Sequence, residues 1–173
     1  TDKKMDTQVG SLVWMPKTGG FGLWGTFGDY DDHQKVATRL WLHFSHSREE
    51  KQSQPGTEGI ENSQIRLTDG SIIFTPDLFG PGITVNEVDY RMSSVDAGVK
   101  YKGLSLEGEY YWRWLSNFTG LNTSGIANIN DHGYQLQTSA MVVPKALQLY
   151  LGASQIFGRF GDQWEVRGGQ NWY

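Results

Sequence analysis

The chain has 173 residues, and 15 Lys plus Arg against 19 Asp plus Glu give a net charge of −4, which offers no basic surface for nucleic acid. It contains no cysteine, which excludes disulfides and thiolate sites for metals or catalysis. Seven Trp and 22 Gly against five Pro favour β-structure, and no apolar run approaches the ~20 residues of a membrane helix.

Two glycine-rich stretches near the start, 8–15 and 20–30, are weak strand candidates. The first clear strand begins at Val36, because apolar and polar residues alternate from there with period two. One face is mostly apolar and consists of Val36, Thr38, Leu40, Leu42 and Phe44. The other face is mixed and consists of Lys35, Arg39, His43 and Ser45 with Ala37 and Trp41.

A long polar connection, residues 47–64, follows this strand, and another weak strand candidate lies near 64–74. The stretch PDLFGPG, residues 76–82, is apolar but rich in turn-forming residues. Two interpretations stay open for it: an ordinary surface loop, or a segment that folds inward and narrows a pore.

The residues around Lys102-Gly103 predict a tight hairpin. Apolar residues or glycine occupy odd positions from Val95 to Tyr101 and even positions from Leu104 to Trp114, so the pattern switches where a two-residue turn requires it. On the apolar side the expected pairs are Tyr101 with Leu104, Val99 with Leu106, Ala97 with Gly108 and Val95 with Tyr110. On the polar side they are Lys100 with Ser105, Gly98 with Glu107 and Asp96 with Glu109.

A second long polar connection, 117–133, precedes another alternating pair of strands, from Tyr134 and from Leu147. A turn at Pro144-Lys145 predicts that Val142 faces Leu147, Ala140 faces Leu149 and Leu136 faces Ala153. Pro-Lys is not a favoured two-residue hairpin pair, so we expect the turn to be wider than two residues while the register holds. With a weak candidate at 164–173, the sequence predicts about nine strands and no helix.

Loop lengths and strand lengths favour a membrane barrel over a soluble one. The tight turns lie at one end of the predicted sheet and the long loops at the other, as in outer-membrane barrels. The clear strands run about 10 to 12 residues, whereas soluble strands cluster near ~5–6 and membrane strands need ~9–11. Large aromatics border the loops and turns on the apolar face, namely Tyr101, Trp112, Trp114 and Tyr134. We expect these four side chains to lie at the lipid–water interfaces.

Three phrases, VDAGVKYKGLSLEGEYYWRW, GYQLQTSAMVVPKALQLYLGASQIFG and WEVRGGQNWY, resemble the phosphate-selective porin O and P type of outer-membrane proteins. The similarity extends from about Val36 to Tyr173. It implies an antiparallel barrel of about sixteen strands in the outer membrane of a Gram-negative-type bacterium. It also implies a homotrimer whose partners are membrane lipid and small hydrophilic solutes or anions. Because nine strands are too few, we expect residues 1–173 to be a single β-barrel domain that is an incomplete segment of a larger barrel.

The sequence thus predicts an all-β antiparallel meander that forms part of a transmembrane β-barrel, with passive passage of solutes as its function. The residues expected to line the pore are Arg39, His43, Asp96, Lys100, Glu107, Glu109 and Arg113. We expect no cofactor and no metal, since His43 and His46 point to opposite faces of their strand. No nucleophile–base pair can be placed, so the sequence predicts no enzyme.

Alternatives remain at this stage. A soluble β-barrel that binds an apolar ligand shows the same alternation with its apolar face inward. A structural barrel with a plugged lumen would insert in lipid without conducting. Glu107 and Glu109 share one face and have the residue types of a glycosidase pair, although an acidic pore lining partly neutralised by Arg113 and Lys100 is favoured. DYDDH, residues 29–33, is interpreted as a solvated turn rather than a calcium loop.

Overall fold

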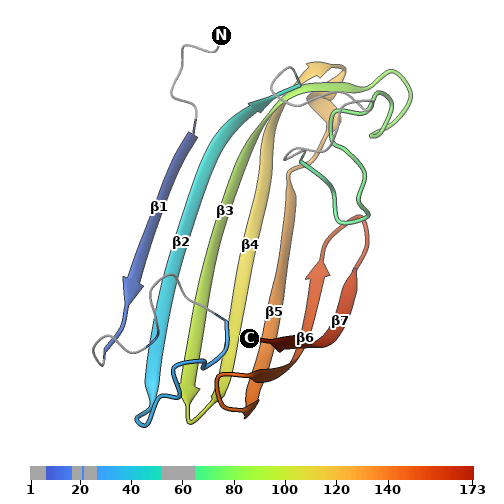
Figure 1. The fold of residues 1–173 in the computed structure, drawn as a ribbon. Coiled ribbons are helices and arrows are strands. Elements are labelled where there is room, and N and C mark those ends of the chain that lie inside the picture. Colours follow the sequence, from blue (N-terminus) through green and yellow to red (C-terminus); the bar gives the residue numbers. More distant parts are fainter. Residues whose placement is uncertain (1–6, 17–20, 22–26, 52–64) are drawn as a thin grey trace.

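The computed structural model describes residues 7–16, 21, 27–51 and 65–173, and this part of the chain forms one antiparallel sheet of seven strands (Figure 1). The strands are β1 (Thr7–Trp14), β2 (Ala37–Glu50), β3 (Thr84–Tyr101), β4 (Leu104–Leu121), β5 (Ile129–Val143), β6 (Leu147–Phe157) and β7 (Trp164–Trp172). Each strand pairs with the next one in sequence, so the sheet is a meander with β1 and β7 at its edges. A single 3₁₀ turn, η2 (Thr123–Gly125), accompanies the strands, and the described residues contain no α-helix.

The predicted antiparallel all-β meander is confirmed, but the seven strands form an open sheet and do not close into a barrel. The weak candidates at 8–15 and 164–173 correspond to β1 and β7. The candidate at 64–74 is wrong, because its described residues form turns with one bridge between Arg66 and Ile72. The described residues of the candidate at 20–30 also form turns and bends. The expected number of about nine strands was therefore too high for the described chain.

The hairpin at Lys102-Gly103 has the predicted register. Tyr101 faces Leu104, and the pairing continues without interruption through Asp96 and Glu109. Lys102 has φ 47° and Gly103 has φ 77°. Positive φ at both central residues is the signature of the type I′ turn, whose twist matches that of the flanking strands.

The second hairpin differs from the prediction near its turn. Leu136 faces Ala153 and Ala140 faces Leu149, as predicted. Leu147, however, faces Val143 rather than Val142, because a bulge between Met141 and Val143 adds one residue to β5. The connection is three residues long, 144–146, so the turn is wider than two residues as expected.

The strands extend into both predicted long loops, although the whole connection between β2 and β3, 51–83, is longer than the loop expected there. The polar residues after Trp114 continue β4 as far as Leu121, which pairs with Thr84. The loop expected at 117–133 therefore shrinks to 122–128. The first four residues of the loop expected at 47–64 belong to β2, which ends at Glu50. Lys51 is a turn residue, and residues 52–64 lie outside the described part of the chain.

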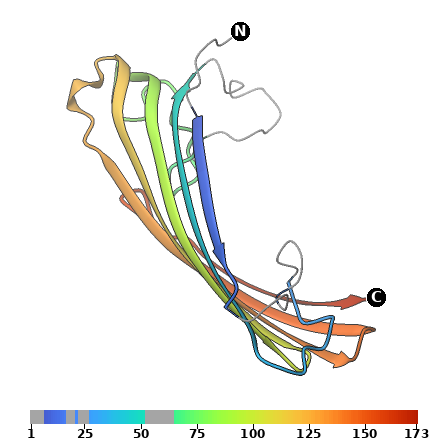
Figure 2. The same cartoon turned by 90° about the vertical axis from the view of Figure 1, so that its left-hand side faces the viewer.

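The sheet is strongly curved, and two connections lie against its concave side (Figure 2). Residues 27–36 lie at the end that carries the Lys102-Gly103 turn, here called the turn end. Residues 65–83 lie at the opposite end, here called the loop end. The sequence predicted short turns at one end of the sheet and long loops at the other. The long connection between β1 and β2 lies at the turn end, so this separation is not complete.

The main apolar core lies at the loop end, between residues 65–83 and the strands. Its buried members are Ile65, Leu67, Ile73, Phe74, Val85, Val88, Leu115 and Ile129. Leu78 and Phe79 of the PDLFGPG stretch pack against this core. The rest of the stretch is turn structure with 76, 77, 81 and 82 exposed, so it is a surface loop anchored by two apolar side chains, and its narrowing of a pore stays a prediction.

Candidate functional site

All seven residues that the sequence assigned to a pore lining lie on the concave face of the sheet. They come from three neighbouring strands: Arg39 and His43 from β2, Asp96 and Lys100 from β3, and Glu107, Glu109 and Arg113 from β4. The strict alternation of each strand and the paired registers put them on one side, since side chains that face each other across a ladder share a face. They form three layers between the turn end and the loop end.

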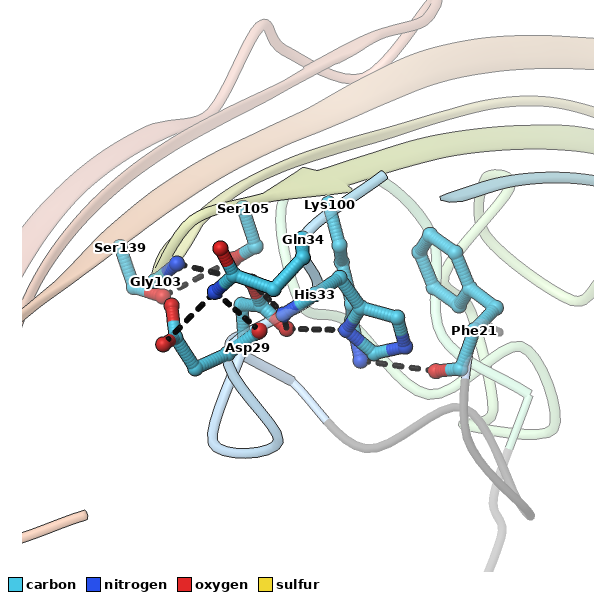
Figure 3. A network of polar contacts seen from close by, with 9 residues as sticks. Phe21, Asp29, His33, Gln34, Lys100, Gly103, Ser105 and Ser139 are labelled. Atoms are coloured by element: carbon cyan, nitrogen blue, oxygen red, sulfur yellow. Dashed lines mark hydrogen bonds and ion pairs between the residues drawn. The ribbon is translucent and has the colours of Figure 1, made fainter. Parts of the chain in front are cut away.

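The layer at the turn end contains Lys100 and Arg39 around the ring of Phe21, and Figure 3 shows Lys100 and Phe21. The Lys100 Nζ donates a hydrogen bond of 2.8 Å to the Phe21 carbonyl oxygen and lies 4.5 Å from the ring centroid. The Arg39 guanidinium carbon lies at the same 4.5 Å from that centroid. The aromatic face thus stabilises two buried cations, an arrangement that strengthens when water is excluded.

Asp29 fixes residues 27–36 to the β3–β4 turn (Figure 3). Its side chain is completely buried and accepts hydrogen bonds from the Gly103 N–H, at 2.8 Å, and from the His33 N–H, at 3.0 Å. It also pairs with the His33 ring nitrogen Nδ1. The predicted solvated turn at 29–33 is therefore wrong for Asp29, whose carboxylate is satisfied by a backbone amide 74 residues away in sequence.

The middle layer is a network of acids and bases. Arg39 Nη2 lies 3.3 Å from the Glu107 carboxylate and 4.0 Å from that of Asp96. His43 Nε2 lies 3.3 Å from the other Asp96 oxygen. Glu109 sits beside this network, opposite Asp96 in the ladder. A small cavity of about 90 Å³ opens here and is lined by Asp96, Glu107, Gly108, Glu109, Gln135 and Gln137.

The layer at the loop end is organised by Arg113. Its guanidinium pairs with Asp131 of β5, and its Nη1 donates to the Arg66 carbonyl oxygen at 2.7 Å, which ties residues 65–83 to the strands. A cavity of about 560 Å³ lies beside this pair. Tyr90 lines the cavity together with Met92 and Tyr111.

The ion pairs differ from those expected from sequence. Glu107 was expected to be partly neutralised by Arg113 and Lys100; Lys100 does attract it electrostatically, but its hydrogen-bonded partner is Arg39. Arg113 instead pairs with Asp131. Asp131 was missed because it lay inside the stretch interpreted as a loop. Its alternation with Gly133 and Gln135 was the signal that β5 begins earlier.

The convex face carries the apolar side chains, and these are exposed. Tyr101, Trp112, Trp114 and Tyr134, the four predicted interface aromatics, all lie on it with 37–39% of their surface exposed. Trp112 faces His132 across the β4–β5 ladder, and His132 faces Phe157 across the next ladder. The stacked rings of His132 and Phe157, 5.1 Å apart, extend the aromatic row across three strands. Sequence reasoning missed His132, which the same alternation placed in β5.

Beyond this aromatic row the convex face becomes charged. Arg48 Nη1 lies 2.7 Å from Asp89, and its Nη2 lies 2.8 Å from Glu87. The Asn117 side chain donates to Asp89 at 2.6 Å. Burial opposes ionisation of Asp89, but the hydrogen bonds from Asn117 and Arg48 outweigh it and hold its pKa below the usual value. On β2 and β3 the convex face therefore carries an ion pair, Arg48–Asp89, two residues beyond the level of Trp114.

Within the described ranges no three His, Cys, Asp or Glu side chains are placed to hold a metal ion. His43 and His46 lie on opposite faces of β2, as predicted, because they are three residues apart in one strand. Their partners in β3 are Ser94 and Arg91, respectively. The helices of the described residues include none long and apolar enough to cross a membrane.

Comparisons of the chain with family models, with curated proteins and with solved structures gave no match.

Proposed function

We propose that the sheet is part of a porin-like β-barrel in an outer membrane, through which small hydrophilic solutes or ions pass by diffusion. In this arrangement the convex face contacts lipid and the concave face lines the water-filled path. No chemical step is part of this function, and the pore-lining residues act only through their charge and size.

The observation that carries the proposal is the inverted burial of the two faces. On the convex face Leu106 is 46% exposed, Leu136 49% and Leu149 44%. On the concave face Lys100 and Ser105 are each 2% exposed. A soluble sandwich or barrel puts its apolar face inside, and a soluble monomer rarely exposes a continuous apolar patch of this extent. Lipid is the environment that suits such a face.

The dimensions of the strands fit a bilayer. From Leu104 to Trp114 the convex side of β4 spans ten residue steps, which is about 34 Å along the strand. At the roughly 40° tilt of outer-membrane strands this corresponds to about 26 Å along the membrane normal, close to the apolar band of ~25 Å. The charged cluster around Arg48 then lies just outside the hydrocarbon region.

The open edges β1 and β7 require further strands in a membrane. Each unpaired backbone N–H or C=O costs several kcal/mol in hydrocarbon, so only a closed barrel is stable there. We therefore infer that additional strands complete the barrel. The homotrimer and the outer-membrane location remain predictions of the family resemblance.

A non-conducting structural barrel is the second candidate, because residues 27–36 cover part of the concave face. Planar-bilayer recordings separate the two functions, since a pore gives discrete conductance steps and a plugged barrel gives none. Absence of any steps in the properly folded, lipid-inserted protein would exclude the pore.

Charge reversal then tests the assignment of the faces. Replacing Glu107 and Glu109 by Lys is expected to shift the reversal potential in a salt gradient toward the anion, because both lie on the concave face. Glu109→Lys alone is the milder variant, since the described residues give Glu109 no ion pair. Glu50→Lys makes the same change on the convex side of β2, beyond the aromatic row, and is expected to leave the potential unchanged. Equal shifts in both variants would remove the two glutamates from the conduction path.

A further inference from the structure

Residues 27–36, here called the strap, are attached to the concave face at the turn end by backbone and carboxylate bonds. The Lys102 N–H donates to the His33 carbonyl oxygen at 2.9 Å, and the Gly103 N–H donates to Asp29 at 2.8 Å. Both amides of the type I′ turn are thus used by the strap, and Figure 3 shows the contact between Gly103 and Asp29. Because Asp29 is completely buried, losing these bonds would leave unsatisfied polar groups, which makes the attachment strong.

A second attachment joins the strap to β5 and β6. Gly28 has φ +90° and lies directly against the side chains of Gln148 and Ser139, with no room for a Cβ atom. Gln148 is itself fully buried and donates to Ser139 Oγ at 2.8 Å. The strap therefore covers the hydrogen-bonded side chains of Gln148 and Ser139, which would otherwise face the lumen.

Phe21 provides a third attachment, ahead of the strap in sequence. Its ring is 1% exposed and lies in a socket on β3 that exists because residue 98 is glycine. A Cβ at Gly98 would collide with the Phe21 ring. The ring lies between Arg39 and Lys100, and the Lys100 ammonium group also binds the Phe21 carbonyl oxygen.

These contacts cover the two basic side chains next to Phe21, Lys100 and Arg39, but not Arg113, which pairs with Asp131, or Arg167, which pairs with Glu165. Lys100 is 2% exposed and Arg39 is 6% exposed, whereas Asp96 and Glu109 remain partly exposed and line the 90 Å³ cavity. The strap also adds Asp31 and Asp32, which are at least partly exposed, against Lys35, whereas its third aspartate, Asp29, is buried. Solutes at this level therefore meet carboxylates, while the two cations are reached only if the strap is displaced.

We propose that the strap and Phe21 set the charge selectivity of the pore by covering Arg39 and Lys100, so that the pore prefers small cations. This inference rests on the proposed pore function and specifies its substrate class. The physical basis is that charged side chains lining a narrow path favour the counter-ion, and only a side chain that solutes can approach acts as such a lining.

Phe21→Ala is the decisive variant, because it loosens the strap without changing any charge. The expected result in a potassium chloride gradient is a shift of the reversal potential toward the chloride equilibrium potential, together with a larger single-channel conductance. Asp29→Asn should act in the same direction. Gln34→Ala is the matched control, since the Gln34 side chain bonds only to Asp32 within the strap, and it should leave both quantities unchanged.

The absence of cysteine in the chain allows a second measurement that needs no current. Ser105 is 2% exposed and pairs with Ser139 beneath the strap, whereas Gln135 is partly exposed on the same face. A charged thiol reagent should modify Ser105→Cys slowly and Gln135→Cys rapidly in the lipid-inserted protein. Adding Phe21→Ala or Asp29→Asn should accelerate modification at position 105 alone.

The outcomes separate the two proposals. If the parent protein conducts but Phe21→Ala leaves the reversal potential unchanged, the role of the strap is refuted and the pore stands. If Ser105→Cys reacts as fast as Gln135→Cys without any strap substitution, the strap does not cover this face and the inference is also refuted. If no variant conducts, the pore fails, and with it the inferred selectivity.

Discussion

At the residue scale, Arg48 lies on the convex face beyond the aromatic row and binds two carboxylates and two further oxygens. Its three guanidinium nitrogens reach Glu87, Asp89, the Asn117 carbonyl and Thr119. Arginine suits this role because its planar fork donates to several acceptors at once and keeps its charge. Burial lowers the pKa of Arg48, but the hydrogen bonds that Arg48 donates to Asp89 and Glu87 outweigh it and raise the pKa.

Asp89→Asn tests this cluster through its pH dependence. Because the pKa of Asp89 is lowered in the folded protein, its ion pair stabilises the fold above the unfolded value of ~3.9 and is lost as the pH falls through the folded value. We expect Asp89→Asn to lower the free energy of unfolding by roughly 1 kcal/mol at pH 7, with a smaller difference at pH 3, which lies below the unfolded pKa. Urea titrations at both pH values measure this. An equal difference at pH 7 and pH 3 would contradict the assigned cause.

Single residues also show where sequence reasoning stops. The face of each of the seven charged residues followed from alternation alone, because a strand has only two sides. The burial of Asp29 did not, since it depends on an amide 74 residues away that no local pattern encodes. The same holds for Arg113, whose partner Asp131 is set by the β4–β5 register.

At the element scale, the β3–β4 hairpin is specified by its two-residue turn. Gly103 has φ +77°, and a Cβ there would lie 3.2 Å from the Met141 Cβ. Gly103→Ala is expected to reduce the free energy of unfolding by about 1–3 kcal/mol, since non-glycine residues are strained at this φ. Gly10→Ala in β1 is the control, because nothing lies within 4 Å of an added Cβ there. Equal urea midpoints for the two variants would show that the turn conformation is not costly.

The extent of the strands was harder to predict than their register. Apolar alternation ends at Trp114, so the polar residues that follow were interpreted as a loop. They nevertheless remain in β4, because β3 begins at Thr84 and offers ladder partners up to Leu121. Backbone pairing needs no apolar side chain, and this part of the sheet is held by the core beneath residues 65–83 instead. The bulge at Met141–Val143 likewise has no signature in the side-chain pattern.

At the scale of the whole molecule, the two faces of the curved sheet differ in what covers them. The concave side receives the strap and residues 65–83, which bury polar side chains, while the convex side has no covering segment among the described residues. We therefore expect the sheet to associate in water through its exposed apolar face, unless lipid or detergent covers that face.

Depth-dependent fluorescence quenching tests how the molecule sits in a bilayer. Single cysteines carrying an environment-sensitive dye are introduced at Leu136, in the middle of the convex face, and at Asn130, which faces Trp114. Lipids brominated near the bilayer centre should quench the dye at position 136 more than shallow ones do, and the order should reverse at position 130. These two positions differ by six residues on one strand, or about 16 Å along the membrane normal at a tilt of ~40°.

The same dye at Gln135 serves as the reference, because this residue adjoins Leu136 but points to the concave side. Neighbouring residues of a strand lie at nearly the same depth and differ only in the face they present. An aqueous quencher should therefore reach the dye at 135, and brominated lipid should not. If lipid quenches position 135 and water-borne iodide quenches position 136, the convex side faces water, and neither a pore nor a selectivity strap is compatible with that arrangement.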